Sequence, residues 1–196
     1  MHKILLGTNT ADSEPNHLMI AKVRIPTEAT LQDLSDKPEK EIASTSFAEK
    51  KLDIEIKMIH EGEVNKARYM PQKFNIIASM TNSGEIHIFD YMQHSQAKDE
   101  NVAKPQLKLQ FHTKEGFGLS WSSINEGKLI TGAYDNGIAL WDIQKGGSNN
   151  ILKPESTFLS HEEPVGDVCF SRRIANTFAS VGDDKFIKLF LFEILK

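Results

Sequence analysis

The chain has a single cysteine, Cys169, so no disulfide can form within it. No apolar run approaches the roughly 20 residues that span a bilayer, which argues against a transmembrane helix and a membrane partner. The N-terminal residues Met1-His2-Lys3 lead directly into a strand-like segment, without the apolar stretch and small-residue cleavage site of a signal peptide. No Asn-x-Ser/Thr sequon is present. These absences predict a location in the nucleus, and also in the cytoplasm.

Excess positive charge is also lacking, because 23 Lys and Arg face 27 Asp and Glu for a net charge of −4. Direct nucleic-acid binding normally needs a basic surface, so we expect none. Gly116-Phe117-Gly118 lacks the third glycine and the strand-to-helix context of a phosphate-binding loop, and no cofactor is predicted. No nucleophile, base and orienting group can be assembled either. We therefore predict a protein that is not an enzyme.

What the chain does have is a repeat. Three times a histidine is followed by an aromatic residue nine positions later and by another aromatic residue twenty-nine positions later. The three sets are His60, Tyr69 and Phe89; His112, Trp121 and Trp141; and His161, Phe170 and Phe190. Successive histidines are 52 and 49 residues apart, a period that is typical of propeller blades or solenoid units.

The content of the middle unit favours strands. Short apolar and β-branched runs at 118–121, 128–132 and 138–141 are separated by turn signals at 125–127 and 135–137. No stretch keeps apolar residues at helical spacing for long, so helical repeats are disfavoured. An outer strand fits before each histidine, at 52–59, 107–111 and 156–159. The sequence thus predicts an all-β fold of about three four-stranded antiparallel blades, a partial propeller whose ring is not closed.

The middle unit resembles a WD repeat. His112, Ser120, Asp135 and Trp141, followed by Asp142, match the histidine, serine, aspartate and tryptophan-aspartate positions. The resemblance implies a chain of hydrogen bonds from indole to hydroxyl, imidazole and carboxylate, which pairs each buried polar group. The other units depart from the pattern, so we expect their networks to be incomplete. The departures are Arg68, Ser83 and Phe89 in the first unit, and Cys169 and Phe190, beside a retained Asp184, in the third.

A narrower resemblance covers nearly the whole chain. It is similar to the histone-binding WD-repeat proteins of the Msi/RbAp type, which include subunits of type B histone acetyltransferase and of chromatin assembly factor. The runs Arg68-Tyr69-Met70-Pro71-Gln72 and Lys114-Glu115-Gly116-Phe117 carry it best, because blade geometry does not demand them. The matching stretches are 5–8, 16–21, 60–72, 76–91, 114–121 and 140–143. The resemblance implies histones as partners, together with acetyltransferase, chromatin assembly or deacetylase subunits.

Residues 1–196 are read as one partial WD-repeat propeller. Its repeat units are expected near 52–91, 107–143 and 156–192, and a hairpin at 3–26 is assigned to a preceding blade. Polar segments at 30–51, 92–106 and 144–155 are predicted to be flexible loops. The family implies a ring of seven blades, which at about 45 residues each needs roughly 300 residues or more. We therefore expect a truncated product or a partial gene model, with an apolar strand near 187–192 at an open edge.

The family also implies a peptide site. Its ring face binds basic peptides, such as a histone tail, through residues three and five positions after each histidine. Those positions here are Glu63 and Asn65, then Glu115 and Phe117, while the third unit has Pro164 and Gly166. The same loops contain three further carboxylates as weaker candidates: Glu61, Glu162 and Glu163. A second family site, between an N-terminal helix and a loop of a late blade, is expected to be absent.

Two alternatives stay open. Glutamates in these loops could be merely solvated, and a generic WD-repeat scaffold that binds a non-histone peptide would share the same repeat. A metal site at His60, His112 and His161 is disfavoured, because each histidine starts a different blade and no cysteine or closely spaced histidine accompanies it. The role of a hydrogen-bonded structural residue explains them better, and no metal site is predicted.

Overall fold

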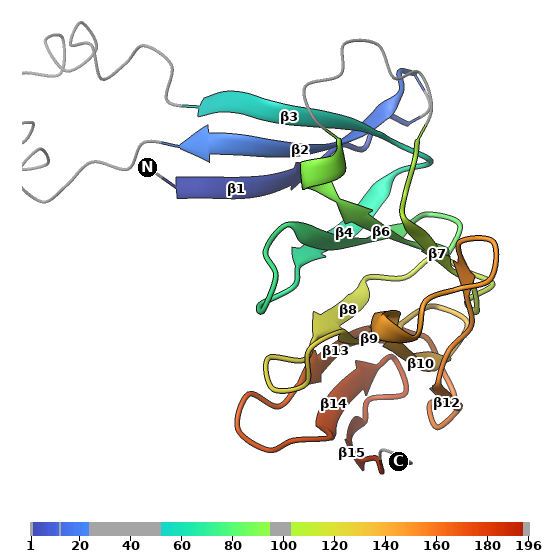
Figure 1. Ribbon diagram of the computed structural model, residues 1–196. Helices are drawn as coiled ribbons and strands as arrows, with labels where there is room; N and C mark the ends of the chain where they lie inside the picture. Colours follow the sequence, from blue (N-terminus) through green and yellow to red (C-terminus); the bar gives the residue numbers. More distant parts are fainter. Residues whose placement is uncertain (1, 12, 24–51, 95–102, 194–196) are drawn as a thin grey trace, which may run out of the picture.

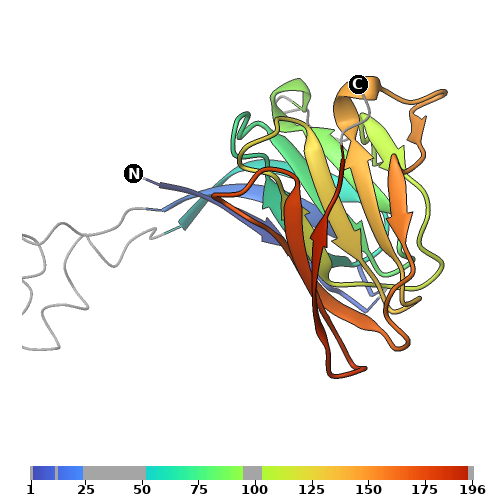
Figure 2. The ribbon, with the colours of Figure 1, turned by 90° about the horizontal axis from the view of Figure 1, so that it is seen from below.

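The computed structural model of the chain describes residues 2–11, 13–23, 52–94 and 103–193. Their secondary structure is almost entirely strand, arranged in four sheets that follow one another without closing into a ring (Figure 1). The view from below places the C-terminal sheet in front of the others (Figure 2). This arrangement confirms the predicted all-β partial propeller. The predicted polar segment 30–51 lies outside the described residues, as do residues 24–26 of the hairpin and 95–102 of the second polar segment.

In the N-terminal part of the chain, the first sheet ends with β3 and the chain then enters the second sheet. The first sheet has the order β1-β2-β3, all antiparallel, and the second has the order β11-β7-β6-β5-β4. The strands of the first are β1 (His2–Gly7), β2 (Asn16–Val23) and β3 (Leu52–His60). Those of the second are β4 (Val64–Tyr69), β5 (Ile76–Thr81), β6 (Ile86–Asp90) and β7 (Leu107–Leu109), with β11 (Ile151–Leu152) and the 3-10 turn η1 (Tyr91–Gln93).

The two C-terminal sheets continue the series. The third has the order β12-β10-β9-β8 and the fourth the order β13-β14-β15. The third contains β8 (Gly118–Trp121), β9 (Lys128–Gly132), β10 (Ile138–Asp142) and β12 (Ser156–Phe158), with η2 (Ile143–Lys145) after β10. The fourth contains β13 (Val165–Phe170), β14 (Thr177–Gly182) and β15 (Ile187–Leu191).

The strand expected before each histidine is present, but it pairs with the preceding unit. β3 pairs with β2, β7 pairs with β6, and β12 pairs with β10. Each sheet therefore takes its last strand from the segment that leads to the next histidine. At each histidine the chain then passes from that strand to the first strand of the next sheet. Strand composition alone cannot choose between the two neighbouring sheets.

The segment 144–155 is more ordered than its polar composition predicts. β11 lies within it and pairs in parallel with β7, with Ile151 opposite Lys108 and Leu152 opposite Leu109. Leu152 is buried in the core between the second and third sheets. The connection between the second and third units thus extends the second sheet and ties the second and third sheets together.

Three apolar cores fill the spaces between successive sheets. Ile77 and Phe89 pack with Leu18 and Met58 between the first and second sheets. Trp121 and Trp141 belong to the largest core, between the second and third sheets. Phe178 is at the centre of the last core. Successive side chains of a strand point to opposite faces of the sheet, so each sheet can contribute apolar side chains to the cores on both of its sides. Within the described residues, no helix is long and apolar enough to cross a bilayer.

Candidate peptide-binding face

A hydrogen-bond chain fixes the start of the middle unit. The indole Nε1 of Trp141 donates to Thr131 Oγ1 at 2.9 Å, and His112 Nε2 lies 2.8 Å from the same hydroxyl. His112 Nδ1 lies 3.1 Å from Asp135 Oδ1. Because a carboxylate accepts only, Nδ1 carries the proton and the Thr131 hydroxyl donates to Nε2. Every polar atom along this buried chain is thereby paired.

The hydroxyl in this chain belongs to Thr131, and the assignment of Ser120 from the sequence is wrong. Leu119 on β8 lies opposite Thr131 on β9, and successive residues of a strand point to opposite faces. Ser120 therefore points away from the face that holds His112 and Trp141. Its hydroxyl oxygen accepts a hydrogen bond from the backbone N–H of Phe170 at 3.1 Å, which links β8 to β13.

The same arrangement recurs in the other units. Each hydroxyl lies nineteen residues after its histidine: Ser79, Thr131 and Ser180. His161 also keeps its carboxylate, with Nδ1 2.8 Å from Asp184 Oδ2. In the first unit the carbonyl oxygen of Gly62 takes that place, 2.9 Å from His60 Nδ1. The networks of the first and third units therefore lack the indole, and that of the first unit also lacks the carboxylate. Each retains its histidine and hydroxyl. Arg68 and Cys169, like Ser120, are not network positions.

Protonation of His60 is disfavoured by burial. Burial lowers the pKa of His60 to about 4, and the hydrogen bond to Gly62 offsets only part of this effect. For Asp135, burial raises the pKa, but hydrogen bonds from His112 and from the amides of Thr113 and Gly137 outweigh it and lower the pKa. A neutral His60 imidazole and an ionised Asp135 carboxylate are the states that hold their loops in place at neutral pH.

We expect unfolding free energy to fall as the pH is lowered from about 6.5 to 4. A histidine with a lowered pKa in the folded state binds fewer protons than in the unfolded state, so its contribution is complete above pH 6.5 and is lost toward pH 4. For His60 the loss is up to about 3 kcal/mol. Urea titrations at several pH values measure how the unfolding free energy depends on pH. His60→Gln should reduce the pH slope, and an unchanged slope in this variant would contradict the assignment.

The loops after the first two histidines meet at one end of β4 and β8. Asn65 Nδ2 donates to Glu115 Oε2 at 3.3 Å and to the carbonyl oxygen of Gly116 at 3.4 Å. Asn9 Nδ2 donates to Glu63 Oε2 at 2.9 Å, which ties the β1–β2 connection to the same place. Three of the four main candidates, Glu63, Asn65 and Glu115, thus lie in directly linked segments of neighbouring sheets.

Phe117, the fourth main candidate, lies on the same loop as Glu115. Its ring is 38% exposed and packs against Tyr134, with ring centroids 5.7 Å apart. The backbone N–H of Tyr134 donates to the carbonyl oxygen of Glu115 at 2.9 Å. At Gly116, an added Cβ would lie 2.6 Å from the carbonyl oxygen of Gly132, so only glycine fits this close approach. The loop that presents Glu115 and Phe117 is therefore held firmly against the third sheet.

The weaker candidates divide into two groups. Glu162 and Glu163 are exposed, and the carbonyl oxygen of Glu162 accepts from Asn136 Nδ2 at 2.8 Å, which places this loop beside the turn that follows Tyr134. Glu61 lies apart from this loop. Its carboxylate pairs with Lys108 on β7 of the second sheet at 2.6 Å. The structure therefore does not join Glu61 to Glu63 and Glu115.

One ion pair near this face was missed by sequence reasoning. Lys66 on β4 forms an ion pair with Asp167 on β13 at 2.7 Å, although β8 lies between these strands. The ion pair therefore reaches across β8 and links the second sheet to the fourth. Asp167 is six residues after its histidine, one beyond the expected offset. A β-bulge at Val165–Asp167 and another at Val64–Lys66 shift the register at these positions, and sequence spacing cannot show them.

Comparison with known protein families places a match at the N-terminal part of the chain. Residues 1–27 match the family model that describes histone-binding protein RBBP4 and a subunit of the CAF1 complex. The predicted resemblance to the histone-binding proteins of the Msi/RbAp type is confirmed. The matched region contains β1 and β2, and the carbonyl oxygen of Thr8, directly after β1, accepts a hydrogen bond from the backbone N–H of Val64 at the start of β4. The histone-binding family match thus falls on the sheet that packs next to the candidate face.

Proposed function

We propose that the chain is a non-catalytic subunit that binds basic histone-tail peptides at the face formed by Glu63, Asn65, Glu115 and Phe117. The observation that carries the proposal is the Asn65–Glu115 contact, which joins carboxylate-bearing loops of two sheets. The histone-binding family match at residues 1–27 supports the same class of ligand. Such a subunit would present histones to acetyltransferase, chromatin assembly or deacetylase machinery in the nucleus, and also in the cytoplasm.

The chemistry of the face suits lysine- and arginine-rich peptides. Clustered carboxylates attract such peptides and speed their encounter, with an effect that weakens as salt is added. The exposed edge of Phe117 offers a ring to the alkyl part or the cation of a lysine or arginine side chain. Glu162 and Glu163 extend the face toward the third unit, where Gly166 leaves open space. We leave Glu61 out because Lys108 neutralises it.

We expect the double variant Glu63→Lys and Glu115→Lys to weaken binding of a histone-tail peptide at least tenfold at low salt. Each change replaces an attractive charge with a repulsive one beside a cationic ligand, and like charges at an interface cost several kcal/mol. Both residues are outside the apolar cores, so folding should be preserved. Isothermal titration calorimetry at two salt concentrations measures the effect.

The matched control is Asp53→Lys with Glu126→Lys, which changes the net charge equally at residues remote from this face. The control should bind as the unmodified chain does. Equal affinity in both double variants would overturn the assignment of the face. Equal binding of a scrambled peptide with the same charge would favour the generic scaffold over a histone-specific subunit.

A further inference from the structure

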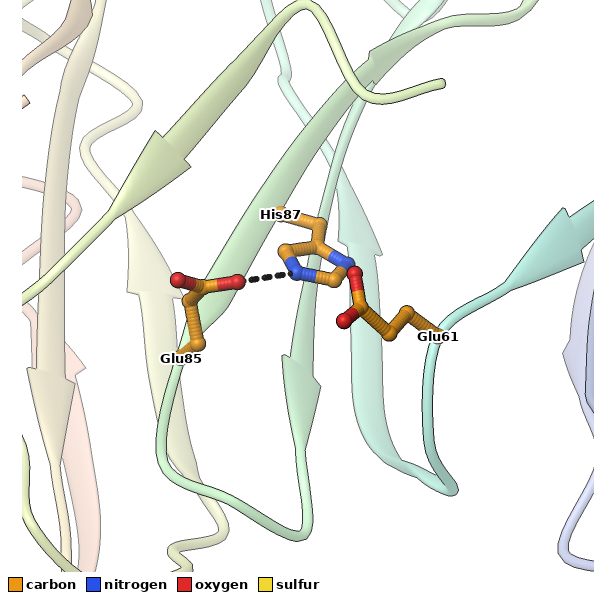
Figure 3. A group of neighbouring side chains, drawn as sticks. All are labelled: Glu61, Glu85 and His87. Carbon is orange, nitrogen blue, oxygen red and sulfur yellow. Dashed lines mark hydrogen bonds and ion pairs between the residues drawn. The ribbon is translucent and has the colours of Figure 1, made fainter. Parts of the chain in front are cut away.

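A separate polar cluster lies on the outer part of the second sheet. It contains Glu61 directly after β3, Glu85 directly before β6, and His87 on β6 (Figure 3). One ligand atom from each of the three lies within 4.8 Å of the others. His87 Nε2 lies 2.7 Å from Glu85 Oε2, and the opposite nitrogen, Nδ1, faces the carboxylate of Glu61 (Figure 3).

The protonation state of His87 can be worked out from its partners. Gln110 Nε2 donates to Glu85 Oε1 at 2.7 Å, and Lys108 Nζ lies 3.2 Å from Glu85 Oε2, so the Glu85 carboxylate is placed as an acceptor. His87 Nε2 must therefore carry the proton that Glu85 accepts. A neutral imidazole is the form in which histidine binds metal ions. In a neutral imidazole with Nε2–H, the other nitrogen, Nδ1, carries a free lone pair.

That lone pair is the unusual feature of the cluster. The His87 side chain is only 1% exposed, and Nδ1 has no hydrogen-bond partner in the part of the chain that the structure describes. A buried acceptor without a partner is costly and calls for an explanation. A lone pair that faces a carboxylate cannot be paired by that carboxylate, because both groups only accept. A cation between them satisfies both.

We propose that Glu61, Glu85 and His87 form a binding site for a divalent transition-metal ion of the zinc class. His87 Nδ1 and the Glu61 carboxylate are the ligands, and water completes the coordination. Glu85 orients the imidazole from the opposite nitrogen, which is the arrangement in which metal-binding histidines are usually held. Imidazole nitrogen with carboxylate oxygen suits Zn²⁺ better than Mg²⁺, which prefers oxygen ligands. This site is independent of the proposed peptide-binding face.

Lys108 determines how tightly the ion binds. Its Nζ lies 2.6 Å from Glu61 Oε2 and 3.2 Å from Glu85 Oε2, and its side chain is 31% exposed. The ammonium group thus neutralises the same carboxylates that attract the metal ion. Because the side chain reaches solvent, it can turn outward when an ion enters. Metal and lysine compete for Glu61, so removal of the lysine charge should strengthen metal binding.

The test is a calorimetric titration of the chain with ZnCl2. We expect Glu61→Gln to weaken Zn²⁺ binding at least tenfold and Lys108→Gln to strengthen it severalfold. The matched controls are Glu126→Gln and Lys73→Gln, whose side chains pair with each other and not with this cluster, and they should bind Zn²⁺ as the unmodified chain does. Glu61 is 65% exposed, so its replacement should not disturb folding. MgCl2 in excess should not compete.

A second measurement identifies the ligand atom directly. Nitrogen-15 NMR of the imidazole groups should show a Zn²⁺-dependent shift at His87 Nδ1, with Nε2 remaining protonated. Zinc should also raise the melting temperature of the unmodified chain more than that of Glu61→Gln, because the ion ties the loop after β3 to β6. The proposal is overturned if Glu61→Gln and Lys108→Gln both bind Zn²⁺ as the unmodified chain does. It is also overturned if the imidazole shifts occur only at other histidines.

Discussion

Replacement of Thr131 by valine is expected to lower the unfolding free energy by about 4 kcal/mol, since each buried polar group left unpaired costs about 1–3 kcal/mol. Two groups lose their partner: the indole N–H of Trp141 and Nε2 of His112. Valine has nearly the same shape as threonine, so the loss reports the hydroxyl alone. Urea denaturation of the purified chain measures this free energy.

Two companion variants separate the network from general packing. Thr131→Ser keeps the hydroxyl and should remain close to the unmodified chain. Ser120→Ala removes only the hydrogen bond from the Phe170 amide, so the expected loss is about 1 kcal/mol. A larger loss for Ser120→Ala than for Thr131→Val would show that the hydroxyl of the network had been assigned to the wrong residue.

Phe178→Ala should destabilise the last two sheets by about 3–5 kcal/mol, the usual cost of removing a fully buried phenylalanine side chain. Phe178 is inaccessible to solvent and stacks on Phe190 with ring centroids 4.6 Å apart and an interplanar angle of 11°. Phe158 from β12 contacts the same ring at 5.2 Å, so Phe178 links the third sheet to the fourth. Thermal or urea unfolding monitored by circular dichroism measures the loss.

Phe186→Ala is the matched control for this substitution. Phe186 has the same side chain and lies in the turn between β14 and β15 of the same sheet, but it is 63% exposed. Its removal should change the unfolding free energy by less than about 1 kcal/mol. Similar losses for Phe178→Ala and Phe186→Ala would mean that the aromatic core does not hold the third and fourth sheets together.

Sequence spacing was sufficient to predict the type of fold. The histidines and the aromatic residues that follow them occupy equivalent places because each of the last three sheets repeats the same hydrogen bond between a histidine and a hydroxyl, on β5, β9 or β14. Turn signals such as Asp135-Asn136-Gly137 mark a real turn, in which Asn136 adopts a positive φ of 65°. Local chemistry of this kind can be read along one chain without knowledge of distant contacts.

Contacts between strands are where the sequence reasoning failed. Ser120 was assigned to the network because it matches the serine position of a WD repeat, but the pleat of β8 turns its side chain toward β13. The offset of nineteen residues that leads to Ser79, Thr131 and Ser180 is visible in the sequence and could have corrected this choice. The Lys66–Asp167 pair could not have been found, because it joins strands of two sheets that are not adjacent.

The Glu61–Glu85–His87 cluster shows the same limit. Glu85 and His87 are two residues apart near the start of one strand, a common pattern with no metal-binding signature. Glu61 joins them only because β3 ends beside β6, where the His60 and His87 rings lie 5.2 Å apart. The unpaired Nδ1 of His87 depends on burial and on the direction of one hydrogen bond. Neither is encoded in the spacing of residue types.

The most direct test of peptide binding at the proposed face is to follow backbone amide shifts by NMR while a histone-tail peptide is added. The largest shifts are predicted at Asn65, Glu115 and Phe117, with smaller ones at Glu162 and Glu163. They should diminish as salt is raised. Unmoved amides at Asn65, Glu115 and Phe117, with shifts confined to the apolar hollow lined by Leu5, Phe74 and Tyr91, would contradict the account.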